Sequence, residues 1–488
     1  MKESISEGTV ALGAQLLLAA VCGLVLQVVV GRLLGPEGYG AFSVAGAVLY
    51  TTTAILLMGV PLAVARLTAE HEDRAAVIRS RAIRIQGVAG ILAGAVLWGV
   101  ADALASHLKQ PALAAPLRAG ALSLPLVGIA QVFVQQLNGL RRFRSQAVAM
   151  SSFSVARALA MTLPIALGGS LAGAYYGLSA AAVVFVVTAW SLRDRRPVTE
   201  DFSKSALVKL GLTFTITSAA AAVWGQVDIL MLQGLGRYPA DAGLFTAAST
   251  LVWAPAAPFA PFLQALFPNI SRAAATGPKQ EISRALEKSL LVALLALYPV
   301  AIGAPLAGPS LIALLYGKAF AGAGAVLAPL AVGITLFTLY EVFDTALRAG
   351  GHAMTSMVLT LFLIGLHVAL NLVLIPLAQL EGAALSVALV SVAASASAAL
   401  LVGRSLRIRF AWRSAARGLA IAAIAFAPMA LWGPPPGLIT LAVAAASLGA
   451  YVVAMRWLEP ELAAELAGMA RSGAKRLWPR ARQNQARD

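Results

Sequence analysis

Apolar runs of about 20 residues recur along the whole chain, and they constrain its fold more than any other feature. An α-helix rises 1.5 Å per residue, so about 20 residues cross the hydrocarbon core of a bilayer. The 488 residues are 59% hydrophobic and only 12% charged, about half the charged fraction of a soluble domain. The runs leave no room for a soluble domain and predict an integral membrane protein.

We expect about fourteen membrane-spanning helices. The runs are rich in Ala, Leu and Val without alternation of period two, which indicates helices rather than strands and an all-α polytopic fold. The expected spans are residues 9–31, 40–65, 85–106, 117–138, 147–168, 171–192, 210–233, 242–268, 289–315, 325–347, 357–376, 383–403, 418–432 and 438–457.

The lysines and arginines are distributed unevenly over the connections between these runs. With a cytoplasmic N-terminus, few of the 37 cations fall outside the inner side: Arg32, Lys109, Arg118, Arg237 and Lys318 lie in outer connections, and Arg157 lies within a span. The positive-inside rule therefore predicts a multi-pass protein of the cell (inner) membrane with both termini cytoplasmic. This topology and contact with anionic membrane lipids explain the net charge of +16, so no nucleic-acid partner is expected.

A turn near the N-terminus has a second copy later in the chain. The segment GPEGYGAFSVAGAVL aligns with YPADAGLFTAASTLV, matching Pro36 with Pro239 and Gly40 with Gly243. In each copy we expect a short reversal at the outer face, with proline fixing φ and the retained glycine permitting positive φ. The charges of the first copy are not retained, so the turn is architectural rather than catalytic.

A second pair of segments, LPLVGIAQVF and APLAVGITLF, matches at nearly the same offset. The two matches predict a duplication in which residues 1–200 and 201–403 form two six-helix lobes in a parallel pseudo-twofold repeat, an arrangement used by alternating-access transporters. Residues 404–457 hold two further helices, and residues 458–488 read as a basic cytoplasmic tail.

Several segments resemble one family when taken in order: GRLLGPEGYGAFSV, GVPLAVARL, LNGLRRF, VDILMLQGLGRYPADAGLFTAA, LFPNISRA and ALNLVLIPLAQLEGAALS. Across residues 9–403 the chain resembles the polysaccharide-transporter branch of the multidrug/oligosaccharidyl-lipid/polysaccharide (MOP) exporter superfamily. The resemblance implies two lobes around a central cavity, as in MATE transporters. It also implies a flippase that turns an undecaprenyl-pyrophosphate-linked glycan from the inner to the outer leaflet, with glycan polymerase machinery as a further partner.

The path of such a substrate needs cations and hydrogen-bonding walls. Arg157, near mid-membrane, is the candidate pyrophosphate contact, and the alternative is an ion pair with a carboxylate on a neighbouring helix. Gln131, Gln135 and Asn138 share one helix face, with Gln136 beside it. They are candidates for lining the cavity, or they join helices by hydrogen bonds. Gln15 and Gln27 on the first helix can be interpreted in the same two ways.

The chain has no GxxxxGK[ST] motif, so we expect secondary transport coupled to Na+ or H+, without a cofactor. Asp228, Asn371 and Ser386 fall at a similar depth and offer oxygen ligands to a small cation, while a carboxylate alone can take a proton. Relatives in the lipid-linked-precursor branch have a cation site among these helices. A second carboxylate that can accompany the amide in those relatives is replaced by Ile375 in this chain, so no metal is assigned. A structural role for Asp228 at the outer helix end is the alternative.

Two further sets of polar residues lie within spans. Glu341, Asp344 and Arg348 are candidates for a cytoplasmic gate or proton site, whereas a local Asp344–Arg348 pair reaching toward the cytoplasm is the simpler interpretation. His367 can titrate, but a lone histidine among apolar residues is usually a packing residue.

The expected span over residues 242–268 contains three prolines in its interior, and they predict a kinked helix: Pro255, Pro258 and Pro261.

Two other functions remain open at this stage. A cation-coupled multidrug or small-molecule exporter of the same superfamily is the main alternative, although it predicts an acidic cavity rather than a buried arginine. A membrane enzyme such as a glycan polymerase or ligase needs a substantial outer loop, and the outer connections here are all short. We therefore expect a transporter and not an enzyme.

Overall fold

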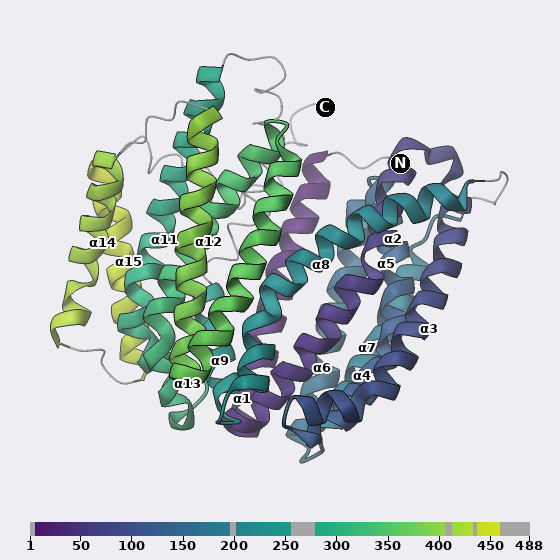
Figure 1. Cartoon of the computed structure of the whole chain (residues 1–488), viewed down its shortest axis with the longest axis horizontal. Helices are drawn as coiled ribbons and strands as arrows, with labels where there is room; N and C mark the ends of the chain where they lie inside the picture. The colour runs from purple at the N-terminus through teal and green to yellow at the C-terminus, as the bar shows by residue number, and fades with distance from the viewer. Residues whose placement is uncertain (1–4, 196–201, 255–278, 406–411, 433–436, 459–488) are drawn as a thin grey trace, which may run out of the picture. The chain divides into compact units, whose positions relative to one another are not determined.

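The computed structural model describes residues 5–195, 202–254, 279–405, 412–432 and 437–458. In these ranges the chain is all-helical, with short 3-10 turns between some of the helices (Figure 1). Ten of the described helices are long and apolar enough to cross a membrane, or up to eleven when one bent pair is counted as a single span. The chain is therefore a multi-pass helical membrane protein, as its apolar runs predict.

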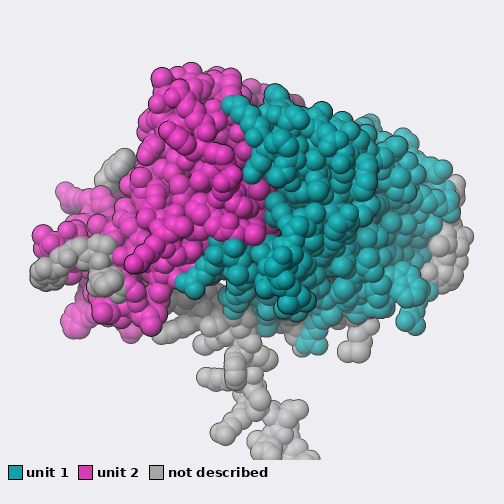
Figure 2. Space-filling model, turned by 90° about the horizontal axis from the view of Figure 1, so that it is seen from below, with its two compact units in different colours: residues 1–33, 45–226, 467–488 teal, residues 34–44, 227–466 magenta. Residues whose placement is uncertain are grey.

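The helices divide between two compact units (Figure 2). The first contains Ala45–Gln226 together with α1 as far as Leu33, and the second contains Leu34–Val44 and the described helices from Val227 onward. The boundary thus falls within α8, downstream of the 200/201 boundary expected from the repeat.

The first unit is built from α2 to α7 with parts of α1 and α8. The bounds are α1 Ile5–Leu57, α2 Gly59–Glu70, α3 Ala75–His107, α4 Ala114–Ala121, α5 Ser123–Gly139, α6 Phe143–Ala166, α7 Leu171–Ser191 and α8 Lys204–Leu235. Helix α5 packs against α2, α3 and α7, and α6 packs against α7. Buried residues of α5, α6 and α7, including Phe133, Ala149 and Phe185, form one apolar core.

The second unit is built around α11. Its helices are α9 Asp241–Trp253, α11 Lys279–Leu315, α12 Leu327–Ala349, α13 Ala353–Ser405, α14 Trp412–Trp432 and α15 Leu438–Leu458. Helices α11, α12 and α13 share one apolar core that includes Leu290 and Val342. A second core, around Leu295 and Tyr451, joins α11 to α14 and α15.

The first two expected spans are joined in α1 without a loop. Only Gly35 departs from helical geometry, with φ 67° and ψ 179°, and Pro36 follows it. A positive φ is a conformation that glycine adopts readily, so Gly35 supplies the reversal. Gly40 and Gly243, the glycines retained in both copies of the turn, lie within helices α1 and α9 and have no positive φ, so that part of the prediction is wrong.

The retained glycines instead allow two helices to approach closely. A Cβ atom added to Gly243 would lie 1.9 Å from the carbonyl oxygen of Pro36 and 2.9 Å from the backbone nitrogen of Gly40. Both turns belong to the second unit. The two matched segments therefore pack against each other at positions where any side chain would clash.

Two expected spans are interrupted where a proline removes a backbone donor, and two others are joined in one long helix. The span 40–65 breaks at Met58, because Pro61 cannot donate in the first turn of α2. The span 117–138 is two helices, α4 and α5, bent by 41° just before Pro125. Residues 357–376 and 383–403 are merged in α13 across a break at Ala378 and Gln379, shortly after Pro376.

Two expectations fall on residues outside the described ranges. The proline-kinked helix over 242–268 is described only in its first part, and Pro255, Pro258, Pro261 and Pro268 are among the residues left out. The basic tail beyond Leu458 is also outside the described part of the chain.

Candidate functional site

A buried carboxylate on α8 contacts two side chains of α13. The Nδ2 atom of Asn371 donates a hydrogen bond of 2.8 Å to Oδ1 of Asp228. The Nε2 atom of His367 lies 2.7 Å from the same oxygen. Asp228 is 8% exposed, His367 2% and Asn371 0%. The three side chains form a compact, buried Asp–His–Asn cluster within the second unit.

The α13 sequence explains why the histidine and the asparagine face the same way. Residues four apart lie above one another on a helix. Leu363, His367, Asn371 and Ile375 follow this spacing, and all four are buried. His367 therefore occupies a core-facing position, as expected for a packing residue, but its partner is a carboxylate. Its spacing from Asn371 was the signal that could have linked it to Asp228.

The cluster has the chemistry of a proton or cation site. A buried carboxylate is unfavourable unless it is protonated, paired or hydrogen-bonded, and Asp228 has both a hydrogen-bond donor and an imidazole at one oxygen. The Oδ1 atom of Asn371 and the hydroxyl of Ser386 are buried without a hydrogen bond within the described residues. Thus Asp228 and Asn371 are brought together, whereas Ser386 bonds to neither.

Arg157 lies in the middle part of α6. Its guanidinium carbon is 5.8 Å from the ring centroid of Phe153, one turn earlier. Its Nε atom is buried without a hydrogen-bond partner, and no ion pair to Arg157 occurs in the described part of the chain. The expected alternative, a carboxylate on a neighbouring helix, is thus not found among these residues. The remaining donor capacity suits an anion.

The glutamine-rich face of α5 divides into two parts. The side chains of Gln135 and Asn138 are joined by a 3.3 Å hydrogen bond, with Gln131 half-buried one turn earlier. Gln136 is fully buried and accepts a 2.9 Å hydrogen bond from Arg79 of α3. Gln136 also donates to the carbonyl of Ala75. Gln136 therefore serves to join helices.

Arg79 precedes the expected span 85–106 in the sequence, and in the structure it is a buried residue of α3 in the first unit. It is 9% exposed and also donates a 2.7 Å hydrogen bond to the carbonyl of Asp194, just beyond α7. Nearby, Arg81 donates to the carbonyl of Phe202, whose ring lies 5.8 Å from that of His71. These contacts hold residues on both sides of the 196–201 segment against α3.

The polar residues of α12 make local contacts. The Nε atom of Arg348 is 2.9 Å from Oδ2 of Asp344, and the hydroxyl of Ser356 donates to the other oxygen of the same carboxylate. Glu341 is half-buried one turn earlier. Asp344 and Arg348 thus form the local pair, and its carboxylate also anchors the start of α13.

The overall fold of the chain is similar to the folds of solved membrane-protein structures. The solved structure of the lipid II flippase MurJ, in an inward closed conformation, matches with a TM-score of 0.75 and 13% identity, covering 91% of this chain and 98% of that one. An inward-facing multidrug resistance MATE family transporter of the MOP superfamily matches with a TM-score of 0.68 and 17% identity, covering 82% and 97%. The chain therefore shares its fold with these two membrane proteins.

Sequence comparison is more specific. Residues 5–274, more than half of the chain, match the family model described as polysaccharide biosynthesis protein, and residues 259–436 match the model of the lipid II flippase MurJ. The chain belongs to the polysaccharide biosynthesis protein family.

The comparisons gave two further results, one from solved structures and one from curated sequences. A MOP superfamily transporter from Pyrococcus furiosus, whose binding pocket is described as having reverse polarity, shares the fold with a TM-score of 0.57 and 16% identity, covering 83% of this chain and 96% of that one. No curated protein matches the sequence.

Proposed function

We propose that this protein is a secondary-active flippase that moves an undecaprenyl-pyrophosphate-linked oligosaccharide from the inner to the outer leaflet by alternating access. The observation that carries the proposal is Arg157, whose buried Nε atom has no hydrogen-bond partner and which has no ion pair among the described residues. A cation held within a membrane-spanning helix is costly unless it meets water or an anion. A pyrophosphate supplies that anion.

The family supports the same class of substrate. The models matched by the chain are those of polysaccharide biosynthesis proteins and of a lipid II flippase, and both names point to lipid-linked or glycan cargo. In this proposal Gln131, Gln135 and Asn138 face the glycan, and the Asp344–Arg348 pair with Glu341 lies at the cytoplasmic gate.

We infer that Asp228 takes the coupling ion, with Asn371 and Ser386 beside it. Of the two candidates, H+ suits the cluster better than Na+, because His367 and Asn371 direct nitrogen atoms rather than oxygens toward Oδ1 of Asp228. The imidazole can exchange a proton with the carboxylate, and neutralising the pair then changes the energy of burying it.

The proposed architecture has fourteen spans in the inner membrane, with both termini cytoplasmic. Val10–Leu57 and Ala353–Arg404 contain 48 and 52 residues, each more than twice the length needed to cross a bilayer. Each therefore counts as two spans joined at its break. We propose two six-helix lobes related by a parallel pseudo-twofold axis, with two further helices. The inner-side cations contact anionic lipids, and glycan polymerase machinery is a further partner.

The test is to follow a fluorescent lipid-linked oligosaccharide in proteoliposomes with a membrane-impermeant quencher. Wild-type protein should move it between leaflets under a proton gradient, and Arg157→Ala should abolish movement while the protein remains folded. Arg84→Ala, an exposed arginine of α3, is the matched control. Full activity of Arg157→Ala would contradict the pyrophosphate assignment.

A multidrug exporter is the second candidate, favoured by the MATE fold and by the buried carboxylate of Asp228. It is tested in cells that lack the gene. A flippase defect should trap a lipid-linked glycan on the cytoplasmic leaflet. If no such intermediate accumulates and export of a cationic dye falls instead, the exporter function is correct.

A further inference from the structure

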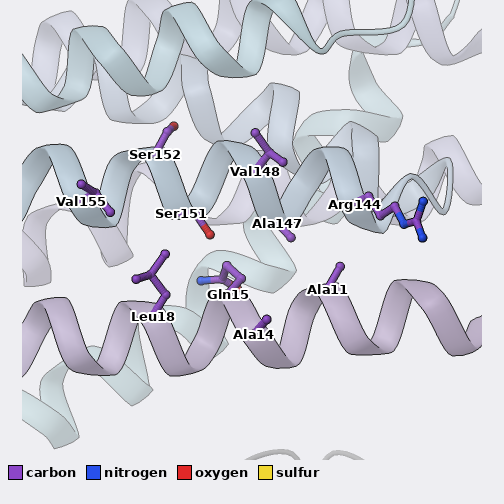
Figure 3. Close-up of a pocket in the computed structure, with 10 residues that line it drawn as sticks. All are labelled: Ala11, Ala14, Gln15, Leu18, Arg144, Ala147, Val148, Ser151, Ser152 and Val155. Carbon is purple, nitrogen blue, oxygen red and sulfur yellow. The ribbon is translucent and has the colours of Figure 1, made fainter. Parts of the chain in front are cut away.

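A groove of about 690 Å³ runs between α1 and α6 of the first unit (Figure 3). Its walls are mainly apolar or small side chains such as Ala11, Leu18 and Val155. Arg144 lies at one end and already interacts with another group of the chain. Walls of this composition suit an acyl chain better than a glycan or a diphosphate, so the groove adds nothing to the candidate site. The feature that extends the site lies in the second unit, at the break in α13.

Gln379 has a backbone conformation that a glutamine rarely adopts. Its φ is 48° and its ψ is −120°, and it follows Ala378 at the break in α13. These angles are those of the first central residue of a type II′ turn, a position at which glycine dominates. A larger residue is strained there and persists only where the surrounding structure holds it. The contacts of Gln379 therefore indicate what the strain maintains.

The side chain of Gln379 makes two hydrogen bonds. Its Oε1 atom accepts a 2.7 Å hydrogen bond from the backbone N–H of Arg237, just beyond the end of α8 at Leu235. Its Nε2 atom donates a 3.3 Å hydrogen bond to the carbonyl of Pro376, which lies before the break in α13. One side chain thus connects the end of α8 to the turn in α13.

The two parts of α13 are in direct backbone contact beyond this turn. A Cβ atom added to Gly382 would lie 2.0 Å from the carbonyl oxygen of Leu374. The turn therefore cannot widen to relieve the strained residue without separating the two parts. The break is a fixed point against which α8 can be held.

The helices joined by Gln379 are the two that carry the Asp–His–Asn cluster. Arg237 is nine positions beyond Asp228 on the α8 side, and Gln379 is eight positions beyond Asn371 on the α13 side. All four residues belong to the second unit. The Asp228–Asn371 and Arg237–Gln379 hydrogen bonds therefore join one pair of helices at two levels. Because N–H···O hydrogen bonds span only about 2.7–3.2 Å, a small shift of α8 along or away from α13 would break the cluster.

We propose that Gln379 is a positioning residue for the coupling cluster. Its hydrogen bond to Arg237 holds the end of α8 against the break in α13, and this keeps Asp228 within reach of His367 and Asn371. Glycine would fit the turn without strain but could not hold α8. The inference rests on the proposed coupling role of Asp228 and adds a residue that contacts neither the ion nor the substrate.

Hydrogen exchange of the full chain in proteoliposomes tests the contact directly, because the donor is the backbone amide of Arg237. Gln379→Gly should speed exchange of this amide by about fivefold or more, since the amide loses its acceptor. Gln379→Glu keeps an oxygen at the end of a side chain of the same length and should keep the protection. Lys109→Gly is the matched control, because Lys109 is another non-glycine residue with positive φ, at 54°, and lies in the first unit. It should leave the exchange of Arg237 unchanged. Unchanged exchange in Gln379→Gly would overturn the proposal.

Two variants at the same position separate positioning from stability. Gln379→Gly and Gln379→Ala both lose the hydrogen bond to Arg237, but only alanine keeps the strained backbone, so the glycine variant should have the higher Tm. Both should lose gradient-driven movement of the fluorescent lipid-linked oligosaccharide by about fivefold or more, the factor expected from one hydrogen bond. Downhill exchange between the leaflets should continue, and Gln379→Glu should retain gradient-driven movement. If activity instead follows Tm, with the glycine variant as active as the wild type, Gln379 is only a turn residue and the proposal is overturned.

The outcomes also separate this proposal from the function on which it rests. If the wild type shows no gradient-driven movement, the flippase proposal fails and the positioning role fails with it. If the wild type is coupled and Gln379→Gly is coupled equally well, the flippase proposal stands and the role of Gln379 alone is overturned.

Discussion

The Nε2 atom of His367 lies 2.7 Å from the Oδ1 atom of Asp228, at the same oxygen that accepts a hydrogen bond from Asn371. The histidine and the aspartate are both buried. A proton added to or removed from this pair therefore changes a charge that little solvent screens. This is the property required of a residue that couples ion movement to a conformational change.

Asp228→Asn should abolish flipping driven by a proton gradient. Asparagine preserves the volume and one hydrogen-bond acceptor of the side chain, but it cannot be protonated near neutral pH. We expect at least a tenfold loss of gradient-driven movement in proteoliposomes, while downhill exchange of substrate between the leaflets continues. Asp102→Asn, in which an exposed carboxylate is lost, is the control. Unchanged gradient-driven activity of Asp228→Asn would place the coupling ion elsewhere.

Arg79→Ala should destabilise the protein. The substitution leaves the buried side-chain oxygen of Gln136 and the carbonyl of Asp194 without the donor that they share. An unsatisfied buried acceptor costs about 1–3 kcal/mol. Thermal unfolding should show a lower Tm for Arg79→Ala, whereas Arg84→Ala, at an exposed position on the same helix, should unfold like the wild type. Equal Tm values for the two variants would show that the Arg79 contacts contribute nothing.

Helix positions could be predicted from sequence because they depend on local composition, whereas the partners of polar residues could not. Arg79 and Gln136 are 57 positions apart, and Asp228 and Asn371 are 143 apart. The second pair was anticipated because expected depth placed the two residues at one level. The role of Arg79 could not be predicted from sequence, since a basic residue near a helix end is typical of a surface charge. The sequence indicated a packing role for His367, because the residues around it in the sequence are apolar.

The repeated turn also shows that contacts between residues distant in the sequence cannot be predicted from local patterns. Proline and glycine in GPEGYG predict a reversal, but three glycines compete for the positive φ, and only Gly35 takes it. The role of Gly40 and Gly243 depends on another segment about two hundred residues away. No local rule identifies a glycine that is required by a neighbouring backbone.

Gly243→Ala should therefore destabilise the second unit. The new methyl group would lie 1.9 Å from the carbonyl oxygen of Pro36, so one of the two helices must shift. Gly365→Ala is the matched control, because nothing lies within 4 Å of a Cβ at that helical position. Alanine in an open helical position is favourable by roughly 0.5–1 kcal/mol. Thermal unfolding should thus move the Tm in opposite directions, and a shift in the same direction would contradict the close packing.

Asp241, the first residue of α9, should make stability depend on pH. Burial, and secondarily the carboxylate of Glu381, raise the pKa of Asp241 to about 6. Its Oδ2 atom is buried without a hydrogen bond within the described residues. In the unfolded chain the pKa is near 3.9. The folded state therefore holds its proton more tightly, and the resulting stabilisation is complete below about pH 4 and lost as the pH rises through 6.

The measurement is unfolding between pH 4.5 and 8 for the wild type, Asp241→Asn and Asp73→Asn. Wild-type stability should fall by on the order of 2 kcal/mol across the range from the ionisation of Asp241. Asp241→Asn should lose this component and be more stable than the wild type at pH 8, because the amide carries no charge to bury. Asp73→Asn, an exposed carboxylate, should keep the wild-type profile. A wild-type profile for Asp241→Asn would mean that another group causes the pH dependence.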